Sequence, residues 1–385
     1  MGGPRLSAHS RQRHGWEPSA SYVTDGWGIH DLRWTQALRS VGLQTQAYSL
    51  ATVPPSLLQT TDADSPRETA PDYVVSSPAQ VIARVGEADG VLAGPLPTVA
   101  RPLVEAGLAN IVGLSWGWDL QEGHPRARSD ADLSWIPALR HLIVDSSVTW
   151  ARARRLGMPE TRMTLMPWGI DLAAFDSSGP IASLDVGSGT RVLLTLRAHE
   201  STYRTEDVID AFAHARLDDA VLIIGSDGSL TPSLRSRVED LGLADHVRFL
   251  GRIPEAQLAP LLRRADAYIS ASETDGTSVT LLQAMACGAP VIVSAIPGNL
   301  PWLDDGRAGQ CFDVGDVQRL ATLLGGIVRR GSTPDERVAR AASIVRERAD
   351  WIRNRRGLRA LLAPTADPLD KDPGGVDQRH VDGDL

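Results

Sequence analysis

The chain has 385 residues, of which 42% are hydrophobic and 22% charged, and its formal net charge is −8. This length exceeds one ordinary core and fits two domains of roughly 170 residues each. The net negative charge disfavours a nucleic-acid partner held by a general positive field. Lys371 is the only lysine, which excludes enzyme classes that need a P-loop or Schiff-base lysine in the folded part.

The composition also disfavours membrane insertion, secretion and cysteine chemistry. No apolar run reaches the roughly 20 residues that a bilayer span needs, and residues 1–16 lack the apolar core of a signal peptide. We therefore expect a cytoplasmic protein without strong membrane attachment. Cys287 and Cys311 are too few for a disulfide framework or a metal cluster, and we interpret both as packed thiols.

The first half of the chain has the elements of one Rossmann-like domain, placed at residues 20–175 after a flexible start at residues 1–19. Residues 51–78 are rich in Pro, Ser, Thr and Asp, which predicts a long loop. The predicted elements around it are a helix from His30 to Ser40, a strand from Thr45 to Leu50, and apolar strands within residues 90–96, 110–116 and 141–146.

The second half is more regular, since apolar runs alternate with helical patterns from Arg191 onward. Such alternation predicts an α/β fold with a parallel sheet, whose ligands bind at the carboxyl ends of the strands. We place a linker at residues 176–190, the second domain at residues 191–345 and a last helix at residues 346–363. Residues 364–385 are acidic and rich in Pro and Gly, and we expect them to be disordered.

The most informative stretch is residues 267–295, AYISASETDGTSVTLLQAMACGAPVIVSA. An apolar strand there leads through a Gly-bearing loop into a helix and then a second apolar strand. Gly276 permits backbone angles that a side chain would forbid, and Thr277 or Ser278 can cap the helix. The first N–H groups of such a helix attract phosphate, so the segment predicts an anion site.

Two polar residues of this segment, Asp275 in the loop and Gln283 on the helix, are eight positions apart. With a rise of about 1.5 Å per residue, they are suitably spaced to bracket a nucleotide sugar whose phosphates lie over the helix start.

The segment resembles the donor site of GT4-type retaining glycosyltransferases of the GT-B fold, whose helix reads Leu-Glu-Ala-Met-Ala-x-Gly-x-Pro-Val. Here LLQAMACGAPVIVS matches closely. In that family two Glu of a Glu-x7-Glu motif contact the transferred sugar and the ribose, and the resemblance assigns these places to Asp275 and Gln283. Asp keeps the charge with a shorter reach, whereas Gln keeps hydrogen-bonding capacity without the charge. Glu273 is an alternative source of the carboxylate.

The resemblance also implies how the donor is held. Backbone and side chains of Gly276, Thr277, Ser278 and Val279 would contact it at the helix start. A nucleoside-diphosphate leaving group gains negative charge as the sugar–phosphate bond breaks, so a positioned cation accelerates the step.

In the family an Arg after the first strand of the second domain and a Lys several residues later grip the diphosphate. This chain has Arg197 in the first place, where we assign it a catalytic role, and no Lys. Arg204 is the candidate for the second charge, with a planar fork in place of an ammonium.

Two further segments resemble the acceptor side of the family. DGWGIHDLRW loosely resembles its Gly-rich first loop and suggests Gly28 and His30. LSWGWDL resembles the segment that brings a Gly and an Asp to the rim of the cleft, which suggests Trp116, Trp118 and, as a catalytic candidate, Asp119. Under the alternative interpretation His30 only starts a helix, Asp119 caps a turn and the tryptophans pack.

The resemblance implies that residues 346–363 cross back to the first domain, and that transfer proceeds with retention and without a metal or other cofactor. We expect a nucleotide-sugar donor and a small soluble molecule or sugar as acceptor, since residues 20–170 show no basic excess that would attract an anionic membrane. The alternatives are a lipid-linked or polysaccharide acceptor and, in another class, a non-catalytic nucleotide-sugar-binding protein.

Overall fold

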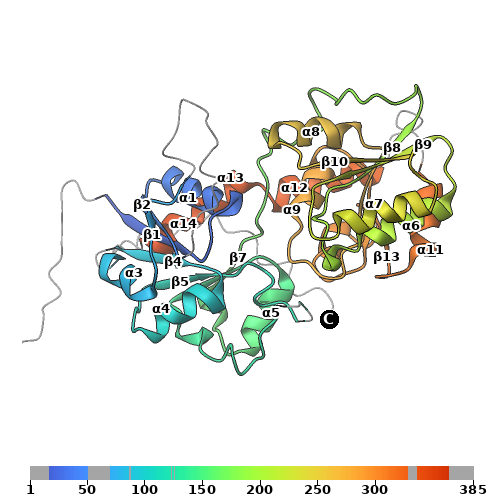
Figure 1. The fold of residues 1–385 in the computed structure, drawn as a ribbon. Coiled ribbons are helices and arrows are strands. Elements are labelled where there is room, and N and C mark those ends of the chain that lie inside the picture. The colour runs from blue at the N-terminus through green and yellow to red at the C-terminus, as the bar shows by residue number, and fades with distance from the viewer. Residues whose placement is uncertain are drawn as a thin grey trace, which may run out of the picture.

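The computed structural model describes residues 17–50, 70–85, 88–122, 124, 126–327 and 336–363. Most of the expected flexible start, the first part of the long loop and the whole acidic tail lie outside these residues. Two parallel sheets form the cores of two domains that lie side by side (Figure 1).

The first domain is built on a seven-stranded sheet with the order β3-β2-β1-β4-β5-β6-β7. Its order reverses between β1 and β4, and every pair is parallel. The strands are β1 (Ser19–Thr24), β2 (Gln44–Ser49), β3 (Tyr73–Val74), β4 (Gly90–Ala93), β5 (Ile111–Leu114), β6 (His141–Val144) and β7 (Met163–Leu165). The helices are α1 (Ile29–Ser40), α3 (Pro78–Val85), α4 (Arg101–Glu105) and α5 (Ser147–Arg155).

The second domain is built on a six-stranded parallel sheet with the order β10-β9-β8-β11-β12-β13, reversing between β8 and β11. The strands are β8 (Arg191–Thr195), β9 (Ala220–Gly225), β10 (Val247–Gly251), β11 (Ala267–Ser270), β12 (Val291–Ser294) and β13 (Gln310–Phe312). The helices are α6 (Thr205–Ala215), α7 (Thr231–Asp240), α8 (Glu255–Arg264), α9 (Val279–Ala286), α10 (Leu300–Leu303) and α11 (Val317–Gly325).

Helices cover both faces of the second sheet, which explains why its strands are nearly continuous apolar runs. Along β8, Val192 and Leu194 enter one core cluster, while Leu193 enters the cluster on the opposite face. Each of the three side chains is fully buried.

The linker runs along α8 and is fixed to it. The Arg263 guanidinium donates hydrogen bonds to the carbonyl oxygens of Ala174, Asp176 and Pro180. The Ala182 N–H donates to the Pro260 carbonyl at 3.0 Å. The connection is therefore held against the second domain on its way to β8.

The last described helices, within residues 350–363, return to the first domain, as Figure 1 shows for the red helices beside α1 and β1. Here the structure differs from the single helix expected over residues 346–363. α12 (Glu336–Arg348) packs on the second domain, and α13 (Trp351–Asn354) and α14 (Leu358–Leu362) pack on the first. The break occurs where Ala349 and Trp351 bond to the backbone of Ile170, and Asp350 then caps α13.

Candidate functional site

Helix α9 begins at Val279 and is capped by the Ser278 hydroxyl, which accepts a hydrogen bond from the Leu281 N–H at 3.4 Å. The helix ends before Gly288, whose φ of +74° is the left-handed conformation that glycine favours. The prediction that a hydroxyl residue begins this helix and a glycine ends it is therefore correct, and the capping residue is Ser278, not Thr277.

Gly276 is required for a different reason from the one expected. Its φ is not positive, so backbone strain does not demand glycine. A Cβ at this position would instead lie 2.3 Å from Oδ2 of Asp145, a residue of the first domain. A larger residue would therefore have to displace the Asp145 carboxylate, because the loop lies directly against the other domain.

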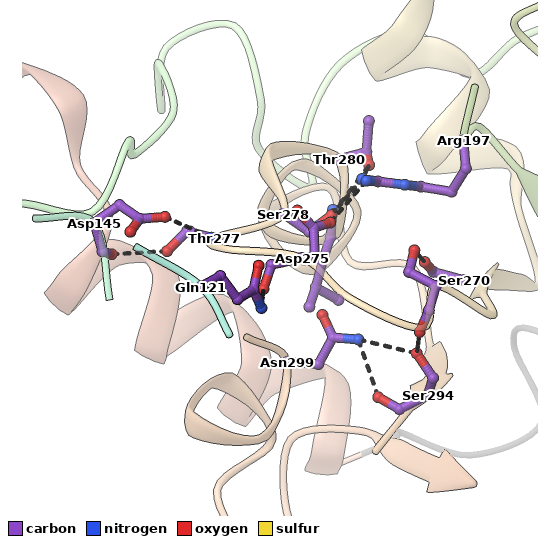
Figure 2. A network of polar contacts seen from close by, with 12 residues as sticks. Gln121, Asp145, Arg197, Ser270, Asp275, Thr277, Ser278, Thr280, Ser294 and Asn299 are labelled. Atoms are coloured by element: carbon purple, nitrogen blue, oxygen red, sulfur yellow. Dashed lines mark hydrogen bonds and ion pairs between the residues drawn. The ribbon is translucent and has the colours of Figure 1, made fainter. Parts of the chain in front are cut away.

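Arg197 reaches the start of α9 from the loop after β8 (Figure 2). Its Nη1 donates to the Ser278 hydroxyl at 2.8 Å and to the Thr280 hydroxyl at 3.2 Å. Its Nη2 lies 2.7 Å from Oδ2 of Asp275, and its guanidinium lies 4.2 Å from the centre of the Tyr203 ring. The fold thus brings Arg197, Asp275 and the helix cap together.

Arg197 remains protonated although its side chain is largely buried. Burial is the largest influence and lowers the pKa of the guanidinium, but the Asp275 carboxylate together with the Tyr268 and Tyr203 hydroxyl groups outweighs it and holds the pKa above its ordinary value. The site therefore contains a permanent cation paired with a carboxylate.

Arg204 is engaged elsewhere. Its Nε lies 2.7 Å and its Nη2 3.1 Å from the two carboxylate oxygens of Asp207 at the start of α6. Its Nη1 is 4.0 Å from Glu273, whereas Arg197 pairs with Asp275. Binding of a diphosphate by Arg204 would require this pairing with Asp207 to be loosened, so its assigned role stays a prediction.

Gln283 lies on α9 and is 8% exposed. Among the described residues, its side-chain amide makes no hydrogen bond to the protein. A buried amide keeps two donors and an acceptor for which a ligand can compensate. The position is compatible with the ribose contact that the sequence suggests, and that contact stays a prediction.

Of the residues expected on the acceptor side, His30 and Trp116 form an aromatic cluster with Trp168. Gly28 caps α1, and its N–H donates to the Asp31 carboxylate at 2.7 Å. The His30 ring makes edge-to-face contacts with Trp168 at 4.8 Å and Trp116 at 6.2 Å between ring centres. Burial, with the nearby Arg33 charge, lowers the pKa of His30 to about 4, so its imidazole is neutral at pH 7.

Asp119 does not lie at the cleft rim as expected. It is fully buried, and its carboxylate accepts hydrogen bonds from the backbone N–H groups of Leu96 and Trp116 and from the Ser115 hydroxyl. Burial raises its pKa to about 6. Three protein donors surround this carboxylate, so it fixes the loop after β5 and is not free to react with a substrate. This agrees with the alternative interpretation, in which Asp119 caps a turn.

Trp118 follows in the same loop and is partly exposed. The Arg126 guanidinium lies 5.7 Å from the centre of its ring, and the His124 ring lies 6.1 Å away. Trp118 is thus surrounded by cationic or titratable groups, and Trp116 by aromatic ones.

Two residues of the first domain that the sequence analysis did not single out contact the loop between β11 and α9, residues 271–278, which is called the donor loop below. The Gln121 amide donates to the Asp275 carbonyl oxygen. Asp145, after β6, accepts a hydrogen bond from the Thr277 N–H at 3.0 Å, and its carbonyl accepts one from the Thr277 hydroxyl at 2.8 Å (Figure 2). The sequence does contain a signal for Asp145, because it directly follows the buried strand β6, and a polar residue at that place lies at the ligand-binding edge of a parallel sheet.

The part of the chain that the structure describes contains neither a cluster of metal-binding side chains nor a membrane-spanning helix. No group of three or more His, Cys, Asp or Glu side chains there is placed to hold a metal ion. No helix there is both long and apolar enough to cross a bilayer.

Comparison with known proteins agrees with this geometry. Residues 181–343 match the family model described as glycosyl transferases group 1. A phosphatidyl-myo-inositol mannosyltransferase of Mycobacterium leprae is 32% identical over 190 residues, which are 48% of this chain and 49% of that protein. An N-acetyl-alpha-D-glucosaminyl L-malate synthase of Bacillus anthracis is 30% identical over 137 residues, 35% of each chain. The chain therefore matches about half the length, or less, of these curated relatives.

Solved structures share the fold over nearly the whole chain. Anabaena Alr3699/HepE in complex with UDP superposes with a TM-score of 0.73 at 15% identity, covering 90% of this chain and 100% of that one. The sucrose-phosphate synthase of Thermosynechococcus elongatus gives a TM-score of 0.71 at 17% identity, with coverage of 89% and 98%. The expected GT-B fold of two facing Rossmann-like domains is confirmed, and residues 181–343 of this chain match the model of the group 1 glycosyl transferases.

Proposed function

We propose that the protein is a retaining glycosyltransferase that moves a sugar from a nucleotide-sugar donor to an acceptor. The observation that carries the proposal is the convergence of Arg197, Asp275 and the hydroxyl-rich start of α9 at the carboxyl ends of β8 and β11. A diphosphate is the ligand chemistry that a buried guanidinium and a helix N-terminus recognise together.

In this proposal the diphosphate binds Arg197 and the first N–H groups of α9. It then competes with Asp275 for the guanidinium, which frees that carboxylate to accept a hydrogen bond from a hydroxyl of the transferred sugar. Gln283 contacts the ribose. As the sugar–phosphate bond breaks, Arg197 stabilises the charge that develops on the leaving phosphate.

Retention follows from attack on the face of the sugar that the leaving group vacates. The leaving phosphate itself accepts the proton of the acceptor hydroxyl. A neutral His30 beside Trp116 and Trp168 contributes shape to the acceptor side, since its low pKa leaves it with no charge at pH 7. No metal is needed, because Arg197 and the helix start supply the positive potential.

A small soluble molecule or a sugar is the acceptor that we propose. The relatives include a D-inositol 3-phosphate glycosyltransferase and the L-malate synthase, whose names contain small polar acceptors. The names phosphatidyl-myo-inositol mannosyltransferase and alpha-monoglucosyldiacylglycerol synthase favour the alternative of a lipid-linked acceptor.

The test has two steps. Thermal-shift measurements with UDP, GDP, TDP and ADP identify the nucleotide, because a ligand that binds only the folded state raises Tm. Sugar nucleotides of that base are then assayed for nucleoside-diphosphate release with inositol phosphates, malate, simple sugars and a diacylglycerol as acceptors. Stabilisation by one nucleotide without turnover of any of its donors would indicate the non-catalytic binding protein, and stabilisation by none would contradict the donor site.

A further inference from the structure

The two domains meet at a contact centred on Asp145. This residue follows β6 in the first domain, and its carboxylate is almost completely buried. One carboxylate oxygen accepts from the Thr149 hydroxyl at 2.9 Å, within its own domain. The other accepts from the backbone N–H of Thr277 at 3.0 Å, in the donor loop of the second domain. This carboxylate is therefore bonded to both domains at once.

Shape complementarity at the contact is provided by two glycines. A Cβ on Gly117, after β5, would lie 2.9 Å from Oδ2 of Asp145 and 3.3 Å from the Cα of Gly276. A Cβ on Gly276 would lie 2.3 Å from the same oxygen. Backbone from each domain thus approaches the carboxylate more closely than any other residue type would allow.

Neighbouring contacts support the same segment. Gln121 of the first domain donates to the carbonyl oxygen of Asp275, and the partly buried Val279 packs against core clusters of both domains. Residues 275–279 are therefore held from the first domain, although they belong to the second.

We propose that Asp145 is a positioning residue for the donor loop: it clamps the Thr277 N–H and so holds Asp275 and the start of α9 in the geometry that the reaction uses. The effect on catalysis rests on the proposed function, whereas the clamp itself does not. Because the Thr277 N–H, which precedes α9, is occupied by Asp145, the donor is left with Arg197, the first N–H groups of α9 itself and the hydroxyls beside them. A donor loop that shifts by about 1 Å can cost on the order of 100-fold in rate.

The clamp is tested first in the nucleotide-free protein, by small-angle X-ray scattering. Asp145→Ala is expected to give a larger radius of gyration than the wild type, since the domains lose a buried contact. Asp266→Ala is the matched control, because Asp266 is also a buried carboxylate that accepts a backbone N–H, from Val192 at 2.7 Å, but within one domain. Identical profiles for the wild type and Asp145→Ala would overturn the proposal, whatever the protein catalyses.

A second experiment tests the steric part of the clamp. Gly276→Ala places a methyl group against the carboxylate and is expected to open the domains like Asp145→Ala. The double variant Asp145→Ala/Gly276→Ala removes the oxygen that the methyl would meet at 2.3 Å and leaves only the Gly117 Cα at 3.3 Å, so its radius of gyration is expected to be close to that of Asp145→Ala alone. Additive opening would show that Gly276 acts independently of Asp145 and would contradict the contact described here.

The third experiment measures steady-state kinetics with the donor identified above. Asp145→Ala is expected to lower kcat about 100-fold. Asp145→Asn keeps an acceptor of the same size and is expected to recover at least 10-fold of that loss, which a merely structural defect would not predict. Wild-type kcat in a folded Asp145→Ala variant with opened domains would refute the positioning role and leave the proposed function intact. Inactivity of the wild type with every donor would contradict the proposed function and leave the scattering result as the test of the clamp.

Discussion

Arg197 and Asp275 neutralise each other at the start of α9, where the proposed donor would bring two phosphates. Their side chains are 11% and 19% exposed, so solvent screens the pair only partly. A diphosphate can displace Asp275 from the guanidinium because it offers more negative charge and more acceptor oxygens. The pair thus prepares both the phosphate contact and the sugar contact of the proposed reaction.

Replacing Arg197 by Ala is expected to lower transfer by about 100-fold or more, since a charge-assisted contact to the leaving group is worth on the order of 3 kcal/mol. Arg252→Ala is the control, because Arg252 belongs to the same domain but its side chain is 84% exposed. Comparing kcat/KM for the two variants with the wild type checks the prediction. An unchanged kcat/KM in a folded Arg197→Ala protein would remove this residue from the site.

Gln283 stands where the family has Glu, and its role can be separated from that of Asp275 by binding alone. Gln283→Ala is expected to weaken nucleoside-diphosphate binding by about 1 kcal/mol, and Gln283→Glu to match or exceed the wild type, because a carboxylate bonds ribose hydroxyls more strongly than an amide does. Isothermal calorimetry measures the three dissociation constants. If they are equal, Gln283 only packs on its helix and Glu273 becomes the candidate ligand.

His30 makes the stability of the first domain sensitive to acid. Its pKa is about 4 in the folded protein, below the ordinary value of 6.5, so the unfolded chain binds the proton more tightly. The resulting stability is present above pH 6.5 and is lost as the pH falls toward 4. His30→Phe keeps an aromatic ring against Trp168 but does not titrate.

Between pH 7.5 and pH 5, the wild type is expected to lose about 1 to 2 kcal/mol more unfolding free energy than His30→Phe. Urea denaturation at the two pH values measures this difference. His141, whose pKa is also lowered to about 4 by burial, contributes equally to both proteins and cancels. Equal losses in the two proteins would show that His30 remains exposed to water.

At the scale of elements, the two domains are joined a second time by the last helices, since α12 packs on the second domain and α13 and α14 pack on the first. α14 lies against β4 so closely that a Cβ on Gly90 would be 2.3 Å from the Leu362 carbonyl oxygen and 2.9 Å from its Cα. Trp351 of α13 packs edge to face on Trp34 of α1, with ring centres 5.1 Å apart. The last helices therefore complete the core of the first domain.

Gly90→Ala is expected to destabilise the protein by about 1 to 3 kcal/mol, because backbone atoms cannot move aside as a flexible side chain would. Gly325→Ala is the control, since a Cβ there meets nothing within 4 Å. Thermal unfolding and limited proteolysis of residues 350–363 compare the two variants. Wild-type Tm and protease resistance in Gly90→Ala would mean that α14 docks less tightly than described.

At the scale of the whole molecule, the proposed donor site lies where the two domains meet, and the groups that would bind the diphosphate come from the protein itself. The described residues supply a guanidinium and a helix N-terminus there. Transfer is therefore expected to survive EDTA unchanged. Loss of activity on chelation, with recovery on adding Mg²⁺ or Mn²⁺, would show that a metal ion holds the diphosphate; the control adds the same ions without chelation.

The sequence by itself determined the features that depend on neighbours along the chain. Apolar runs that alternate with helical patterns predicted the parallel sheet of the second domain, and a hydroxyl start with a glycine stop predicted α9, because caps and periodicity act within a few residues. The family resemblance assigned Arg197 and Asp275 to one donor site, and the structure places the two side chains 2.7 Å apart.

Only the tertiary structure decided which side chain meets which across the fold. Asp145 and Thr277 are 132 positions apart, and their hydrogen bond exists because two sheets face each other. The same holds for Gly276, whose glycine is required by space beside Asp145 and not by its backbone angles. Asp119 and Arg204 are charged residues that resemble site residues in the sequence, yet the fold pairs them with Ser115 and Asp207. A charged side chain takes the partner that folding brings within reach, and sequence spacing does not encode that distance.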